Sequence, residues 1–129
     1  MKDWFEQKFE ILIRHSQNQN VKNYSFTIRQ AITFLEEHYR EEINLEVLAR
    51  QVGLSKNHLC TLFRIETGRN FIDYLHQIRI GQALELLETT DLRVAEVGLN
   101  VGYHDAKYFA KVFQKYQNCS PSEYRQINH

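Results

Sequence analysis

Two short stretches of the chain carry polar and basic side chains at helical spacing, and these are the residue types that contact phosphates and base edges. One stretch begins at Ser55 and the other at Asp105, and in each the apolar residues return every three or four positions. The polar residues therefore fall on the opposite face of each predicted helix. Those positions are Ser55, Lys56, Asn57, Thr61 and Arg64 in the first stretch, and Ala106, Lys107 and Lys111 in the second.

The chemistry open to the first set is hydrogen bonding in a DNA major groove together with neutralisation of phosphate charge. We expect Asn57 and Thr61 to read bases, since asparagine suits the edge of adenine, and Lys56 and Arg64 to lie nearer the DNA backbone. The Ser55 hydroxyl can both cap the helix and contact a phosphate oxygen. Each residue taken alone is equally well explained as part of a solvated helix face.

On the second helix, Lys107 is the best candidate for reading a base, with guanine as its preferred partner. Lys111 either does the same or neutralises a phosphate. Ala106 has no hydrogen-bonding side chain, but it allows a close approach and contact with a thymine methyl group. Asp105 would bring a negative charge near DNA, so we expect its role to be a structural helix cap.

Each of these stretches is the second helix of a predicted helix-turn-helix, and the two units repeat. Leu45, Leu48, Ala49, Val52 and Gly53 correspond to Val94, Val97, Gly98, Val101 and Gly102, at a constant offset of 49 positions. The offset becomes 50 after the turn, because the second turn contains one extra residue. Recurrence of every apolar position in register favours DNA contact over a solvated face.

The remaining apolar patterns predict an all-α, homeodomain-like protein of about seven helices. We expect helices near 27–39, 45–52, 55–67, 71–89 and 121–127, besides the pair in the second repeat. Thr27 and Gln30 form a predicted capping box for the first of these helices. The predicted order is an N-terminal helix and polar linker (1–24), a first helix-turn-helix subdomain (25–75), the rest of a long connecting helix (76–90) and a second helix-turn-helix subdomain (91–129).

The composition is that of a globular protein, with 43% hydrophobic and 25% charged residues over 129 positions. Net charge is zero, but bases gather on the second helix of each repeat and acids gather elsewhere. The two cysteines, Cys60 and Cys119, lie in no metal-binding or disulfide pattern, so a reducing cytoplasm is the simplest compartment. No catalytic motif or phosphate loop is present, and we expect neither an enzyme nor a cofactor.

Two longer segments, TGRNFIDYLHQIRIGQALELL (Thr67–Leu87) and VGYHDAKYFAKVFQKYQNCSPSEYR (Val101–Arg125), resemble the DNA-binding region of the AraC/XylS family of bacterial transcription regulators. The resemblance runs from about Thr27 to Arg125. Two positions depart from the family pattern: Gly98 replaces the usual alanine and Asn118 the usual glycine. Arg79 resembles a family position, and we expect it to form a structural salt bridge or a carbonyl contact.

The resemblance implies a transcription regulator that binds double-stranded promoter DNA and acts with RNA polymerase. The polar segment before Tyr24 is similar to the one that precedes the output domain of response regulators in this family, so a sensor or receiver domain upstream is an expectation. Two recognition helices held about 34 Å apart can enter successive major grooves. Oligomeric state is open, and residues 1–24 have three interpretations: a connecting helix, a pairing surface or the end of an upstream domain.

The alternative function is a helical protein–protein interaction module with weak or no DNA affinity, and the zero net charge favours it. Salt dependence separates the two hypotheses, because binding through phosphates weakens steeply as salt rises.

Overall fold

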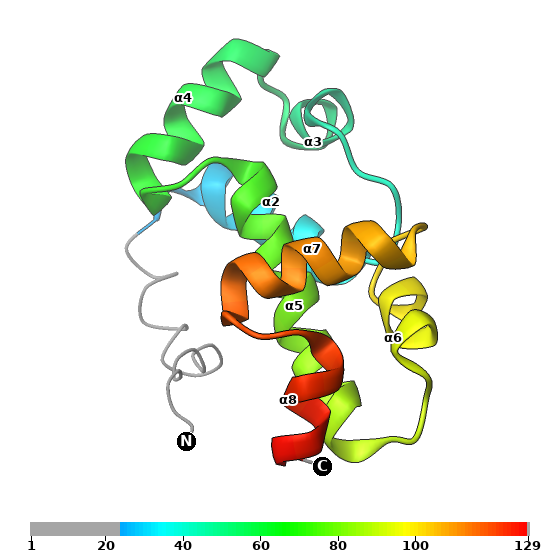
Figure 1. Ribbon diagram of the computed structural model, residues 1–129. Coiled ribbons are helices and arrows are strands. Elements are labelled where there is room, and N and C mark those ends of the chain that lie inside the picture. The colour runs from blue at the N-terminus through cyan, green and yellow to red at the C-terminus, as the bar shows by residue number, and fades with distance from the viewer. Residues whose placement is uncertain (1–23, 129) are drawn as a thin grey trace. The chain divides into compact units, whose positions relative to one another are not determined.

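The computed structural model describes residues 24–128, and this part of the chain contains seven helices and no strand. Figure 1 shows them. The expectation of an all-α fold of about seven helices is therefore confirmed. None of the described helices is both long enough and apolar enough to span a membrane. The helices are α2 (Phe26–His38), α3 (Leu45–Val52), α4 (Lys56–Thr67), α5 (Phe71–Thr89), α6 (Val94–Asn100), α7 (Ala106–Gln117) and α8 (Pro121–Asn128).

The described residues form two compact units. Unit 1 comprises residues 24–35 and 44–71, and unit 2 comprises residues 36–43 and 72–128. Each unit contains one helix-turn-helix pair, α3 and α4 in unit 1 and α6 and α7 in unit 2. The repeat seen in the sequence therefore recurs as structure.

The buried side chains of unit 1 come from three helices, and the sequence pattern predicted their spacing. The apolar stripe of α2 is fully buried, and one face of α3 and one of α4 are buried as well. Removing this much apolar surface from water is the main source of stability for a unit of this size. The side chains are Ile28, Ala31, Ile32, Leu35, Leu48, Ala49, Leu59 and Phe63.

The core of unit 2 is formed by α5, α6 and α7. Three aromatic rings lie in sequence through it: Tyr103 is 5.6 Å from Phe109, and Phe109 is 5.9 Å from Phe113, measured between ring centroids. Such contacts add to the burial of apolar area. The remaining members of the core are Ile80, Ala83, Leu87, Val97, Val101 and Val112.

Side-chain caps begin α3, α4, α7 and α8, whereas the cap predicted for the first described helix is misplaced. Asn44 and Ser55 accept backbone hydrogen bonds at the starts of α3 and α4. The predicted cap at Thr27 is wrong: α2 begins at Phe26, and the Ser25 hydroxyl accepts the N–H of Ile28 at 3.3 Å. The backbone N–H of Ser25 in turn donates to Glu66 Oε1 at 2.7 Å, a contact between residues 41 positions apart. Such a distant partner leaves no local signal in the sequence.

Arg79 fixes the turn within unit 2 through backbone carbonyls. Its Nε donates to the carbonyl of Tyr39 at 2.7 Å, and its Nη2 donates to that of Glu41 at 2.9 Å. The carbonyl contact expected for this residue is thus the one present. Gly102 lies against the same group with φ 112°, and a Cβ there would come within 2.7 Å of the Tyr39 carbonyl oxygen. Only glycine fits this position without strain.

The structure explains both residues that depart from the family pattern, Asn118 and Gly98. Asn118 ends α7 in the left-handed region, with φ 62°, and its N–H donates to the carbonyl of Gln114. Gly98 lies under the ring of Phe109, and a Cβ on it would approach Phe109 Cδ2 to 2.8 Å. The small residue at 98 therefore lets α6 and α7 pack closely.

Candidate nucleic-acid interface

The helix α4 presents a polar face opposite its buried one. Leu59 and Phe63 are fully buried, and they anchor the helix to unit 1. Ser55 caps its start, with the hydroxyl accepting the N–H of His58 at 3.1 Å. This uses one acceptor position of the hydroxyl and leaves the side chain at the exposed end of the helix. The predicted contacts on this helix are all exposed: Ser55, Lys56, Asn57, Thr61 and Arg64.

The helix α7 repeats this arrangement in unit 2. Phe109 and Phe113 are fully buried, as Leu59 and Phe63 are on α4. Asp105 takes the place of Ser55, and its Oδ1 accepts the N–H of Lys107 at 2.9 Å. The structural role expected for Asp105 is therefore present. The predicted contacts on this helix, Ala106, Lys107 and Lys111, are exposed.

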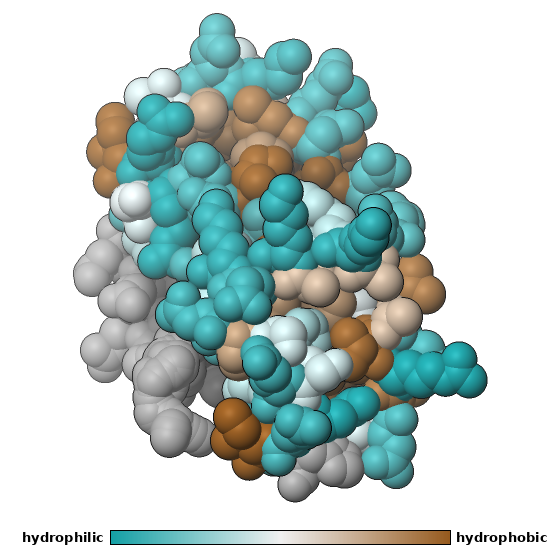
Figure 2. Space-filling model, in the orientation of Figure 1, coloured by the Kyte–Doolittle hydropathy of each residue, from teal (hydrophilic) through white to brown (hydrophobic). Residues whose placement is uncertain are grey.

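The long polar side chains of both sets are available to an outside partner. Among residues 24–128, no hydrogen bond or ion pair involves the side chains of Lys56, Asn57, Thr61, Arg64, Lys107 or Lys111. Hydrophilic side chains cover the middle of the face seen in Figure 2, where α7 lies in Figure 1. Side chains without internal partners break no internal bond on binding, and the cost that remains is the ordering of each side chain, about 0.5–1.5 kcal/mol.

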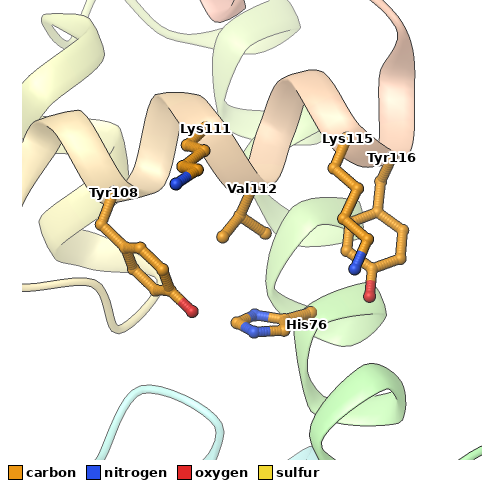
Figure 3. Close-up of a pocket in the computed structure, with 6 residues that line it drawn as sticks. All are labelled: His76, Tyr108, Lys111, Val112, Lys115 and Tyr116. Atoms are coloured by element: carbon orange, nitrogen blue, oxygen red, sulfur yellow. The ribbon is translucent and has the colours of Figure 1, made fainter.

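A hollow borders this face of α7 and was not foreseen from the sequence. It has a volume of about 260 Å³ and is lined by His76 of α5 and by Tyr108, Lys111, Val112, Lys115 and Tyr116 of α7. Figure 3 shows the hydroxyl of Tyr108 directed towards the imidazole of His76, and the ammonium of Lys115 beside the ring of Tyr116. Of these residues, only Lys111 was a predicted contact.

Spacing along α7 gives part of a signal for the hollow, because Tyr108, Lys111 and Lys115 follow one another at helical intervals. His76 lies on another helix, and no local pattern connects it with them. Its ring is held in place: Nδ1 lies 2.6 Å from the Tyr103 hydroxyl, and the two rings stack with centroids 5.7 Å apart.

Burial and two neighbouring cations determine the charge of this histidine. Desolvation lowers the pKa of His76 below its ordinary value, and Arg79 and Lys115 lower it further, while Asp73 acts in the opposite direction. Burial also raises the pKa of Tyr103, so its hydroxyl keeps its proton. The pair is therefore a neutral imidazole beside a neutral phenol at pH 7.

The chain is similar in sequence to a family of helix-turn-helix proteins. A family model described as a helix-turn-helix domain matches residues 48–127. The MmsAB operon regulatory protein of Pseudomonas aeruginosa is 40% identical over 93 residues, which is 72% of this chain and 30% of that protein. The arabinose operon regulatory protein of Escherichia coli is 37% identical over 99 residues, 76% of this chain and 34% of that protein. The chain thus spans about a third of the length of these relatives.

Solved structures show the same fold. The C-terminal domain of AraT, a response regulator from Geobacillus stearothermophilus, superposes with a TM-score of 0.79 at 32% identity, covering 81% of this chain and 88% of that one. The DNA-binding domain of AdpA, a global transcriptional factor solved in complex with a target DNA, superposes with a TM-score of 0.76 at 29% identity, covering 80% and 93%.

Proposed function

The chain belongs to the AraC family of helix-turn-helix transcription regulators, and from that premise we propose that it binds promoter DNA in a sequence-specific manner through α4 and α7. One observation carries the proposal: each helix-turn-helix pair buries one face of its second helix and leaves the other face polar and exposed. A helix presented in this way suits the width of a major groove.

The two helices have different chemistry, so we expect them to read different sequences. The face of α4 offers an amide and a hydroxyl for base edges, with Lys56 and Arg64 for phosphates. The face of α7 offers Lys107 for guanine, and Ala106 permits a close approach. A single chain with two unlike recognition helices can bind a site that lacks two-fold symmetry, with its half-sites in successive major grooves.

The regulator acts in the cytoplasm, where it controls transcription together with RNA polymerase. The likeness to the C-terminal domain of a response regulator supports a place for this chain as the output domain of a longer protein with a sensor or receiver domain. The short share of each relative that the chain spans supports the same arrangement. Neither catalysis nor a cofactor is needed for this function.

Duplex binding measured across a range of salt concentrations tests the proposal. We expect the affinity for a pool of DNA duplexes to fall steeply between 50 and 200 mM salt, by roughly 0.9 log units per log unit of salt for each phosphate contact. The absence of duplex binding at low salt, with the protein folded, would reject DNA recognition in favour of a protein–protein interaction module.

A further inference from the structure

The hollow between His76 and α7 is large enough for a small anion, and two lysines are among the residues that line its mainly apolar wall. Its volume of about 260 Å³ is well above the roughly 30 Å³ that one water molecule occupies in the liquid. A phosphate group therefore fits with water beside it. Two of the six lining residues, Lys111 and Lys115, carry positive charge, and none of the six is acidic.

The cationic and hydroxyl groups of the hollow are already positioned. The ammonium of Lys115 lies 5.5 Å from the centroid of the Tyr116 ring, a distance at which the ring attracts a cation. The Tyr116 hydroxyl donates to Asp73 Oδ1 at 3.2 Å, which engages the carboxylate of Asp73. The Tyr108 hydroxyl points into the hollow from the other side (Figure 3).

His76 lines the hollow from α5 and is held by Tyr103. The protonated hydroxyl of Tyr103 can donate to Nδ1 across 2.6 Å, and the ring hydrogen then resides on Nε2. Burial against Tyr103 also fixes the plane of the ring. A ring held in a fixed plane, in a hollow that two lysines also line, is an arrangement that suits a phosphate oxygen.

We propose that this hollow binds one phosphate group, and that its source is the sugar–phosphate backbone of the duplex whose groove α7 occupies. The inference rests on the proposed function and assigns one contact within it. A helix in a major groove is flanked by phosphates of both strands. Lys111 belongs both to the exposed face of α7 and to the hollow, so a phosphate there lies directly beside the groove. Lys111 is then a phosphate contact, and Lys107 is left to read the base.

A neutral methylphosphonate placed at each backbone position of a bound duplex in turn tests this assignment. One position is expected to weaken binding of the wild-type chain by about three- to tenfold, because it removes one phosphate contact. In Lys115→Gln the same substitution should have a clearly smaller effect, because one of the two lysines that hold the phosphate is gone, and the salt slope should fall by up to roughly 0.9. Arg50→Gln, which removes an exposed charge from α3, serves as the matched control and should keep the full methylphosphonate effect.

Additive losses, in which every methylphosphonate weakens Lys115→Gln as much as the wild type, overturn the inference while leaving DNA binding intact. A thermal unfolding curve for Lys115→Gln that matches the wild type shows that the variant is folded. His76→Gln gives an independent check, because its coupling to the same phosphate, and to no other, should become weaker.

Inorganic phosphate, titrated into the full chain without DNA, separates the two sources of the anion. A saturable shift of the His76 ring signals in nitrogen-correlated spectra, absent in Lys115→Gln, supports phosphate binding in the hollow. If inorganic phosphate shifts the His76 signals but no methylphosphonate position couples to Lys115, the DNA backbone is not the source of the phosphate. If inorganic phosphate causes no shift, the hollow is not a phosphate site. If the wild type binds no duplex at all, the proposed function fails, and this titration still decides whether the hollow binds phosphate.

Discussion

The carboxylate of Asp105 accepts a hydrogen bond from the backbone N–H of Lys107 at 2.9 Å, while the ammonium of Lys107 remains exposed two residues into α7. One residue therefore begins the helix and the other is presented at its surface. In unit 1 the corresponding cap is the uncharged Ser55. The second recognition helix thus starts with a negative charge at the end expected to approach DNA.

Asp105→Ser should separate the capping role from the charge. Serine caps a helix about as well as aspartate does, so the thermal unfolding midpoint should stay close to that of the wild type. Removal of the negative charge should strengthen duplex binding by about threefold at low salt. Asp105→Ala, which removes the cap, should instead cost about 1 kcal/mol of unfolding free energy. Weaker binding by a stable Asp105→Ser would show that the carboxylate itself contributes to recognition.

Gly102→Ala should destabilise the protein by about 2 kcal/mol or more. The backbone at this position has φ 112°, and the added Cβ would meet the Tyr39 carbonyl oxygen at 2.7 Å. Chemical unfolding in urea measures the loss. Gly81→Ala is the matched control, since a Cβ there meets nothing within 4 Å inside the helix α5, and it should be neutral or stabilising. Equal stability of the two variants would show that the turn at Gly102 accepts a side chain without strain.

Arg79→Met should remove two hydrogen bonds while keeping an apolar stem of similar length. The carbonyls of Tyr39 and Glu41 would lose their charged donor, at a cost of about 2–3 kcal/mol in unfolding free energy. The unfolding free energy of Arg79→Lys should lie between those of the wild type and Arg79→Met, because one ammonium cannot reproduce the planar geometry of the guanidinium. Both are compared with the wild type by urea unfolding. A neutral Arg79→Met would show that the two carbonyls find other donors.

Protonation of His76 should weaken the fold in mild acid. Its pKa in the folded chain lies below the ordinary value of 6.5, mainly through desolvation. The unfolded chain therefore takes up this proton first as pH falls below about 6.5, and the stability contributed by the neutral ring is lost from there downward. Unfolding free energies from pH 8 to pH 5 should fall more steeply for the wild type than for His76→Gln. Parallel curves would contradict the lowered pKa.

Sequence patterns predicted most of the secondary structure because it depends on local periodicity and capping. Apolar residues at helical spacing predicted the positions of α3, α4 and α5, and Gly53 and Gly68 marked the ends of α3 and α4. The start of α2 was misplaced at Thr27, because Ser25, two residues earlier, caps the helix, and its backbone N–H is also held by Glu66, which is distant in the chain. Contacts of that kind lie outside any local pattern.

Part of the candidate interface was likewise predictable from local sequence patterns, and part was not. Alternation of apolar and polar residues predicted the exposed face of each recognition helix, because the buried anchors Phe63 and Phe113 orient it. The hollow depends on a histidine from α5 that packs beside α7, and the packing of two helices creates it. The base preference of Asn57 and Lys107 stays a prediction until a bound sequence is known.

Selection of bound sequences from a random duplex pool shows whether α4 and α7 both read DNA. We expect two unlike half-sites with centres about 10–10.5 base pairs apart. Asn57→Ala should lose base preference in one half-site only, and Lys107→Ala in the other only, each by about 1–3 kcal/mol per base pair. A pool without enriched sequences, or one whose preferences survive both substitutions, would contradict the account.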